Sequence, residues 1–347
     1  MIRIRPPRPR TRLSTVPLAC LLGLVAVIAV LFMTPLGRVE DSSGDADTVA
    51  IVDESAAADA GSAGSSDAAS DSPTATATGD PAPTTAAAAS PPDTAAQATD
   101  DTGLDAALDT ALAAALPDTW SGELSVAVID TATGRTAEAN GERTYVSASI
   151  AKVDILATLL LQAEQENRSL TAAEKASAAA MIRRSDNEAA FTLWRSVGGA
   201  SALDAANAEL GLVETTADAD TWGLDTTTVG DQLRLMAALT SESSPLSAAS
   251  RAYALGLMAT VEADQAWGVS AAADEDADSA GTALKNGWLP RNTTGLWVVN
   301  SIGRITHDGR ELLVAVLSDG HTSMAAGVSK VEAAVEAAAE TLNSAAE

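Results

Sequence analysis

The spacing of apolar residues divides residues 104–347 into two kinds of segment. Residues 123–130 alternate as a strand does, and a second strand follows a turn and runs to about residue 139. Three further strands are predicted at residues 281–288, 294–302 and 311–318. Spacings of three or four predict helices, at residues 104–116, 153–161, 171–184, 187–196, 200–210, 229–240, 246–261 and 323–344. This order predicts an α+β fold, in which an antiparallel sheet packed with helices joins both ends of the domain and an all-helical lobe is inserted between them.

The N-terminal part has a different pattern. Residues 1–12 are basic and interrupted by proline, and residues 13–37 are uncharged around a dense apolar core. About 20 apolar residues span a bilayer, and the exit of this segment has no good cleavage site, so an uncleaved transmembrane signal anchor is favoured over a cleaved signal. The arginines precede the segment, so we expect a cytoplasmic N-terminus and the rest of the chain outside the plasma membrane.

Residues 38–103 predict a disordered acidic linker. Ala, Ser, Thr, Asp, Pro and Gly dominate this stretch and leave little to bury. A flexible coil of this length has an r.m.s. reach of roughly 40–45 Å. The linker would therefore hold the following domain clear of the membrane surface.

The content of charged residues, cysteine and histidine excludes some partners and some kinds of site. From residue 104 onward there are 34 Asp and Glu against 15 Lys and Arg, which argues against nucleic acid as a partner because phosphate binding needs clustered cations. Cys20 is the only cysteine, so no intramolecular disulfide can form. His307 and His321 are the only histidines, so a Ser-His-Asp triad would need one of them. We expect no metal ion and no cofactor.

The candidate chemistry starts at the most apolar helix. Ser149 lies at its predicted start, and Lys152 follows one turn later. Residues three apart share a helix face, so the hydroxyl and the amine can touch. A serine needs a base before it can act as a nucleophile, and burial favours the neutral lysine that could be that base. An N-cap serine followed by a solvated lysine is the simpler explanation of a lone Ser-x-x-Lys.

Two later motifs change this interpretation. Ser185-Asp-Asn187 lies between two predicted helices, where such residues are ordinary caps. Lys285-Asn-Gly-Trp288 lies on a predicted strand, where a lysine is usually solvated but a glycine often marks close approach of a ligand. Ser-x-x-Lys, Ser-Asp-Asn and Lys-Thr-Gly in this order form the signature of one enzyme family.

With these motifs, residues 104–347 resemble the serine β-lactamase and penicillin-binding-protein family, most closely its class A β-lactamase-like serine hydrolases. A fourth match is Leu224-Asp-Thr-Thr-Thr228, which resembles the end of the class A omega loop and departs from it at Leu224 and Val229. The resemblance implies a β-lactamase/transpeptidase-like fold.

The resemblance also implies a catalytic role for each matching side chain. Ser149 is similar to the acylated nucleophile, and Lys152 to the adjacent base or proton relay. Ser185 would pass a proton to the leaving nitrogen, and Asn187 would orient Lys152 and a substrate amide. Lys285 would supply positive charge near Ser185 and the substrate carboxylate.

The strand motif and its surroundings carry further implications. The backbone N–H groups of Ser149 and Trp288 would form the oxyanion hole. Asn286 and Gly287 are expected to bind substrate, with an amide in Asn286 where the family has a hydroxyl. The stretch between the first two motifs is shorter than in class A enzymes, which predicts that one wall of the cleft is missing.

Deacylation is where the sequence departs most from the family. Class A enzymes have an omega-loop glutamate, followed by x-x-Leu-Asn, that activates the deacylating water. In residues 211–227, Glu214 is the only glutamate and lacks the following Leu-Asn, and Asp218 and Asp220 are shorter acids. Glu214 is the candidate deacylation base, although all three acids are also explained as solvated loop charges. We therefore expect slow deacylation.

Three functions stay open at this point. The first is a membrane-anchored, extracytoplasmic serine hydrolase of the β-lactamase type, which forms an acyl-enzyme at Ser149 with β-lactams or related amides. The second is a penicillin-binding protein of the D-alanyl-D-alanine peptidase type that acts on the peptides of peptidoglycan. The third is a sensor module that recognises such ligands without turnover. The intact motifs argue against a dead site, whereas Asn286 keeps the third function open.

Overall fold

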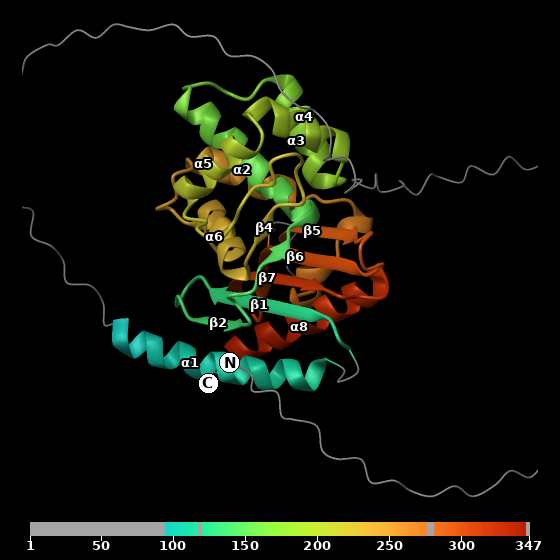
Figure 1. Ribbon diagram of the computed structural model, residues 1–347. Coiled ribbons are helices and arrows are strands. Elements are labelled where there is room, and N and C mark those ends of the chain that lie inside the picture. The colour runs from blue at the N-terminus through green and yellow to red at the C-terminus, as the bar shows by residue number, and fades with distance from the viewer. Residues whose placement is uncertain (1–93, 117–119, 276–280, 345–347) are drawn as a thin grey trace, which may run out of the picture. The chain divides into compact units, whose positions relative to one another are not determined.

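The computed structural model describes residues 94–116, 120–275 and 281–344 (Figure 1). The predicted cytoplasmic tail, the predicted anchor at residues 13–37 and most of the predicted linker lie outside these ranges. Within them, no helix combines the length and the hydropathy needed to cross a bilayer.

A five-stranded antiparallel sheet, in the order β2-β1-β7-β6-β5, forms the central layer. Its strands are β1 (Glu123–Asp130), β2 (Thr136–Ala139), β5 (Ala283–Pro290), β6 (Trp297–His307) and β7 (Arg310–Asp319). β1 pairs with β7 along its whole length, with Ala127 opposite Ala315, so the sheet joins the two ends of the domain as predicted. Successive β1 residues face opposite sides: Val126 and Val128 enter one core, and Ala127 enters the other.

Helices cover both faces of this sheet (Figure 1). On one face lie α1 (Thr94–Ala115) and α8 (Met324–Ser344), with Leu108 and Val335 fully buried. The other face carries the predicted helical lobe: α2 (Ala151–Gln165), α3 (Ala172–Arg183), α4 (Asn187–Val197), α5 (Ala200–Leu210), α6 (Val229–Thr240) and α7 (Ala248–Met258). α2 is buried on nearly all sides, which explains why its sequence is apolar in nearly every direction. The predicted α+β fold class is confirmed.

Two features of the fold differ from the sequence-based expectation. β3 (Tyr145–Val146) pairs with β4 (Thr226–Thr227) in a second, two-stranded sheet, and strands this short give no alternating pattern. α1 begins at Thr94, inside the segment predicted as linker. The residues at its start include alanines but no periodic apolar stripe, so their pattern did not indicate a helix.

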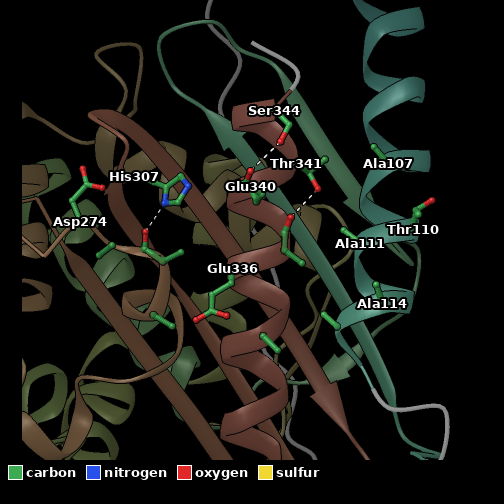
Figure 2. Close-up of a pocket in the computed structure, with 16 residues that line it drawn as sticks. Ala107, Thr110, Ala111, Ala114, Asp274, His307, Glu336, Glu340, Thr341 and Ser344 are labelled. Atoms are coloured by element: carbon green, nitrogen blue, oxygen red, sulfur yellow. Dashed lines mark hydrogen bonds between the residues drawn. The ribbon is translucent and has the colours of Figure 1, made fainter. Parts of the chain in front are cut away.

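A groove of about 1270 Å³ lies between α1 and α8, next to the short helix η3 (Gly268–Ala272) (Figure 2). Alanines of both long helices form much of its lining, together with Glu336, Glu340 and His307. His307 is tied to η3, because its Nδ1 lies 2.7 Å from the backbone oxygen of Ala272.

The other histidine, His321, stacks on Trp120 at 5.0 Å between ring centroids. Its Nε2 lies 2.9 Å from Ser318 Oγ. Both histidines are therefore held by partners other than Ser149, and the two do not provide a Ser-His-Asp triad.

Candidate active site

The segment that carries Ser149 is held in a strained turn. Ser149 lies in η1 (Ala148–Ile150), a single 3-10 turn that leads directly into α2. Ala148 has a φ of 49°, a conformation that costs a non-glycine residue of order 1–3 kcal/mol and persists only where its surroundings enforce it. The backbone N–H of Ser147 donates to the oxygen of Asp225 at 2.8 Å, and that of Ala148 to the oxygen of Gly223 at 3.0 Å. The loop at residues 211–227 therefore holds this turn from one side.

Asn300 of β6 holds the same segment from the sheet side. Its Nδ2 donates to the backbone oxygens of Val146 at 2.9 Å and Ser147 at 3.0 Å. Its Oδ1 accepts the N–H of Ser318 at 3.0 Å, and the side chain is fully buried. Sequence analysis did not single out Asn300, whose only signal was a polar amide within an apolar strand.

Lys152 connects the first two motifs. Its Nζ lies 3.0 Å from Ser149 Oγ, 2.9 Å from Ser185 Oγ and 2.8 Å from Asn187 Oδ1. Ser185 itself has a φ of 57°, a second strained residue in the cluster. The structure thus brings the predicted nucleophile, the predicted base and two residues of the second motif into direct contact.

Lys285 of β5 completes this cluster from the strand. Its Nζ lies 3.0 Å from Ser185 Oγ and donates to the backbone oxygen of Asn286 at 2.8 Å. Ser185 Oγ therefore lies between two lysine amines. The side chains of Lys152 and Lys285 are both buried, at 0% and 1% exposure.

This burial determines the protonation of the two lysines. Desolvation holds the pKa of Lys152 well below its usual value, and the charge of Lys285 lowers it further, while Asp186 opposes the shift. Burial also lowers the pKa of Lys285 to about 7. A lysine that readily becomes neutral can accept a proton, so Lys152 has the chemistry required of a general base for the hydroxyl it contacts.

The third motif brings the strand backbone against the nucleophile. A Cβ atom on Gly287 would lie 2.8 Å from the backbone nitrogen of Ser149 and 2.9 Å from that of Ile150. Only glycine fits this approach. Trp288 follows directly in β5, and its ring packs against Trp267 with centroids 5.8 Å apart.

Comparison with known proteins agrees with this arrangement. Residues 107–178 and 175–345 match the model of the family Beta-lactamase2, described as the Beta-lactamase enzyme family, and these matches cover more than half of the chain. The chain belongs to the beta-lactamase enzyme family. The predicted resemblance is thereby confirmed at the level of a family of β-lactamase-type serine hydrolases. No curated protein sequence gives a significant match.

Solved β-lactamase structures share the fold at low sequence identity. A class A β-lactamase from Bacteroides cellulosilyticus is 15% identical with a TM-score of 0.59, covering 70% of this chain and 99% of its own. A β-lactamase from Xanthomonas campestris is 20% identical with a TM-score of 0.57, covering 69% and 98%. One from Burkholderia vietnamiensis is 23% identical with a TM-score of 0.56, covering 69% and 96%. At these identities, the likeness shows the fold alone.

The side chain of Asn286 does not join the cluster formed by Ser149, Lys152, Ser185 and Lys285. Strand residues alternate between faces, so Asn286 faces away from the side that Lys285 occupies. Its Nδ2 donates to the backbone oxygens of Gln265 at 2.8 Å and Trp267 at 2.9 Å, and its Oδ1 accepts from Ser301 Oγ at 2.6 Å. The amide thus anchors the η2–η3 segment, η2 being Ala263–Gln265, instead of being presented to a substrate.

Glu214 also lies outside the cluster. It is exposed, its Oε2 accepts from Thr228 Oγ1 at 3.1 Å, and its N–H donates to Asp231 Oδ2 at 2.8 Å. These contacts place it at the start of α6. Asp218 is used within the loop, where its Oδ1 accepts the N–H groups of Asp220 at 3.0 Å and Thr221 at 3.1 Å.

The loop residue that does contact the cluster is Trp222. Its ring centroid lies 4.7 Å from Lys152 Nζ. The next residue, Gly223, has a φ of 84° and donates its N–H to the buried carboxyl of Asp225 at 2.9 Å. Sequence analysis missed Trp222, whose only signal was that it is the one aromatic residue in the loop at residues 211–227.

Two further acids, one in this loop and one on α2, have raised pKa values. Burial raises the pKa of Asp225. Burial and the neighbouring Asp225 raise the pKa of Asp154, on α2, well above its usual value. Elsewhere in the described part of the chain, no group of three or more His, Cys, Asp or Glu side chains is arranged to hold a metal ion.

Proposed function

We propose that this protein is a serine hydrolase of the β-lactamase type that forms an acyl-enzyme at Ser149 with β-lactams or related amides. The observation that carries the proposal is an unbroken series of contacts of 2.9–3.0 Å, from Ser149 Oγ through Lys152 Nζ and Ser185 Oγ to Lys285 Nζ. A nucleophile, a base with a lowered pKa and a second proton path are what acyl transfer to a serine requires.

In the proposed acylation, neutral Lys152 takes the proton of Ser149 as the hydroxyl attacks the carbonyl carbon of the amide. The N–H groups of Ser149 and Trp288 stabilise the resulting oxyanion. Ser185 then gives its proton to the leaving nitrogen and regains one from its lysine neighbours. Lys285, with a pKa of about 7, is partly charged at neutral pH and pairs with the carboxylate of the substrate.

In the proposed deacylation, the loop glutamate does not activate the water, because Glu214 is held at the start of α6. Absence of a general base typically slows such a step by ~10²–10⁴-fold. We therefore propose fast acylation and slow release, so that the acyl-enzyme accumulates.

Intact-mass analysis after incubation with a penicillin tests the proposal. The mass should rise by one ligand, and Ser149→Ala should abolish this rise. Ser196→Ala, which changes a serine of α4 whose hydroxyl bonds to the backbone oxygen of Leu193, is the matched control and should label normally. Label retained in Ser149→Ala would contradict the assignment.

A D-alanyl-D-alanine peptidase is the second candidate function. It is favoured by one observation, the position of Glu214 outside the cluster, because such an enzyme does not need rapid β-lactam hydrolysis. Release of D-alanine from a cell-wall peptide, with negligible nitrocefin hydrolysis, would favour this candidate. Stable labelling without turnover of either substrate would indicate a sensor module.

We also propose that residues 13–37 anchor the protein in the plasma membrane with its catalytic domain outside. The support is the uninterrupted apolar segment behind an arginine-rich N-terminus. Protease added to intact cells should release a soluble domain by cutting in residues 38–103. Full protection of the domain would contradict the orientation.

A further inference from the structure

Lys152 is fully buried, and its Nζ is surrounded by protein atoms. Four oxygen atoms of Ser149, Ser185 and Asn187 lie within hydrogen-bond distance of it. The indole of Trp222 lies over the same nitrogen with its centroid at 4.7 Å. A lysine amine has at most three hydrogens to donate, so its hydrogen-bonding capacity is already used by protein atoms.

Trp222 is held in this position by the backbone on its C-terminal side. Gly223, its neighbour, accepts the N–H of Ala148 at 3.0 Å, and Asp225 accepts that of Ser147 at 2.8 Å. The Asp225 carboxyl in turn accepts the N–H of Gly223 at 2.9 Å. The backbone next to Trp222 is therefore attached to the turn that carries the nucleophile.

We propose that Trp222 sets the lifetime of the acyl-enzyme by keeping water away from the ester at Ser149. The inference rests on the proposed function. It attributes the slow release of the acyl group to shielding by Trp222, in addition to the position of Glu214 outside the cluster. An apolar ring offers no acceptor for a water proton, whereas a carboxylate in its place could both contact Lys152 and hold a water.

The step that Trp222 hinders is hydrolysis of the ester. Water oxygen bonds to the acyl carbon while one water proton passes to a base, and the bond from that carbon to Ser149 Oγ then breaks. Ser149 Oγ recovers a proton, and the acid product leaves. Lys152 is the nearest basic group to Ser149 Oγ, and the indole covers it.

Three substitutions at Trp222 distinguish a role in excluding water from the ester from a role in packing alone. Trp222→Ala opens the space, Trp222→Phe keeps an aromatic ring, and Trp222→Glu introduces the missing carboxylate. Trp120→Phe is the control, because Trp120 stacks on His321 away from the cluster. For each variant, the acylation rate is measured from the burst of a chromogenic cephalosporin. The deacylation rate is measured from loss of the acyl mass after excess ligand is removed.

Trp222→Ala should speed deacylation by at least ~10-fold and Trp222→Glu by ~100-fold, the latter by supplying a general base. Trp222→Phe should stay within about 3-fold of the wild type, because it retains the apolar ring. Acylation should change much less than deacylation in Trp222→Ala and Trp222→Phe. If Trp222→Ala does not fold, the other two variants decide the question.

Unchanged deacylation in both Trp222→Ala and Trp222→Glu would overturn the inference. Slower acylation with unchanged deacylation would also overturn it, because Trp222 would then only position Lys152. Rapid hydrolysis by the wild type without acyl-enzyme accumulation would contradict the inference and leave acylation at Ser149 standing. Absence of any labelling of the wild type would overturn the proposed function, and the inference with it.

Discussion

The two sides of the site differ in how closely they follow the beta-lactamase family. On the side of α2 and β5, Lys152 and Lys285 contact the serines of the first two motifs within 3.0 Å. On the side of the omega loop, Trp222 takes the position next to Lys152, and the only glutamate of the loop lies elsewhere. In the proposed mechanism, the two half-reactions therefore depend on separate parts of the fold, so that one can be retained while the other is altered.

The largest expected effect tests the first side. Lys152→Ala should slow acylation by at least ~100-fold, because it removes the proposed base, which contacts the proposed nucleophile. Burst kinetics with a chromogenic cephalosporin measure the effect, and Lys175→Ala, which changes an exposed residue of α3, is the control. A loss of only a few-fold would show that another group accepts the proton of Ser149.

The second prediction concerns the support of the nucleophile turn. Asn300→Leu leaves two carbonyl groups and one N–H group without their partner. Each such group costs about 1–3 kcal/mol of the free energy of unfolding. Acylation should slow by roughly 10- to 100-fold through misplacement of the nucleophile.

Urea unfolding and burst kinetics measure these two effects of Asn300→Leu. Asn343→Ala is the matched control, because Asn343 bonds to Asp308 in an exposed pair. Normal acylation by a folded Asn300→Leu protein would show that this residue supports stability alone.

The third prediction uses the coupling between the two lysines. The charge of Lys285 is one cause of the lowered pKa of Lys152. Lys285→Met removes this charge, so the pKa of Lys152 should rise and its neutral form should appear only at higher pH. The acid limb of the acylation profile should therefore move to higher pH.

Acylation rates of wild type and Lys285→Met across the neutral range measure this shift. Lys175→Met should leave the acid limb in place. An unmoved limb in Lys285→Met would show that Lys152 is not the group whose titration limits acylation.

The smallest expected effect concerns the other side of the comparison. Glu214→Gln should change deacylation by less than about 2-fold, because Glu214 bonds to Thr228 and lies outside the cluster. The rate at which the acyl mass disappears measures it. If turnover vanished in this variant, Glu214 would be the deacylating base after all, and the loop would have to rearrange during the reaction.

Sequence patterns predicted the parts of the fold that local rules determine. β1 has the predicted bounds, and α3 begins with the expected capping box, in which Thr171 and Glu174 each accept a backbone N–H of the other. Such elements depend on residues close in sequence. The order of the motifs also predicted which side chains meet, because Ser149, Lys152, Ser185 and Lys285 carry the family signature.

The remaining features depend on contacts between distant segments. Three such contacts join residues more than 60 positions apart. They are the pairing of β3 with β4, the hydrogen bonds from Asn300 to the turn that carries Ser149, and the contact of the Trp222 indole with Lys152. That Asn286 faces away from the cluster could have been anticipated from strand alternation, because Lys285 beside it had to face the cluster. Its partners in the η2–η3 segment could not have been identified from the sequence pattern.

The pairing of β1 with β7 has a consequence for how this domain acquires its activity. β1 is synthesised early. Its sheet partner β7 is formed by residues 310–319, and only α8 follows β7 among the described elements. Pairing over such a separation is slow to form and leaves an open strand edge until it does. The turn that carries Ser149 also depends on β6, because Asn300 of β6 donates a hydrogen bond to this segment. We therefore expect a growing or truncated chain to contain α2 with both Ser149 and Lys152 and yet show no reactivity until the last strands are in place.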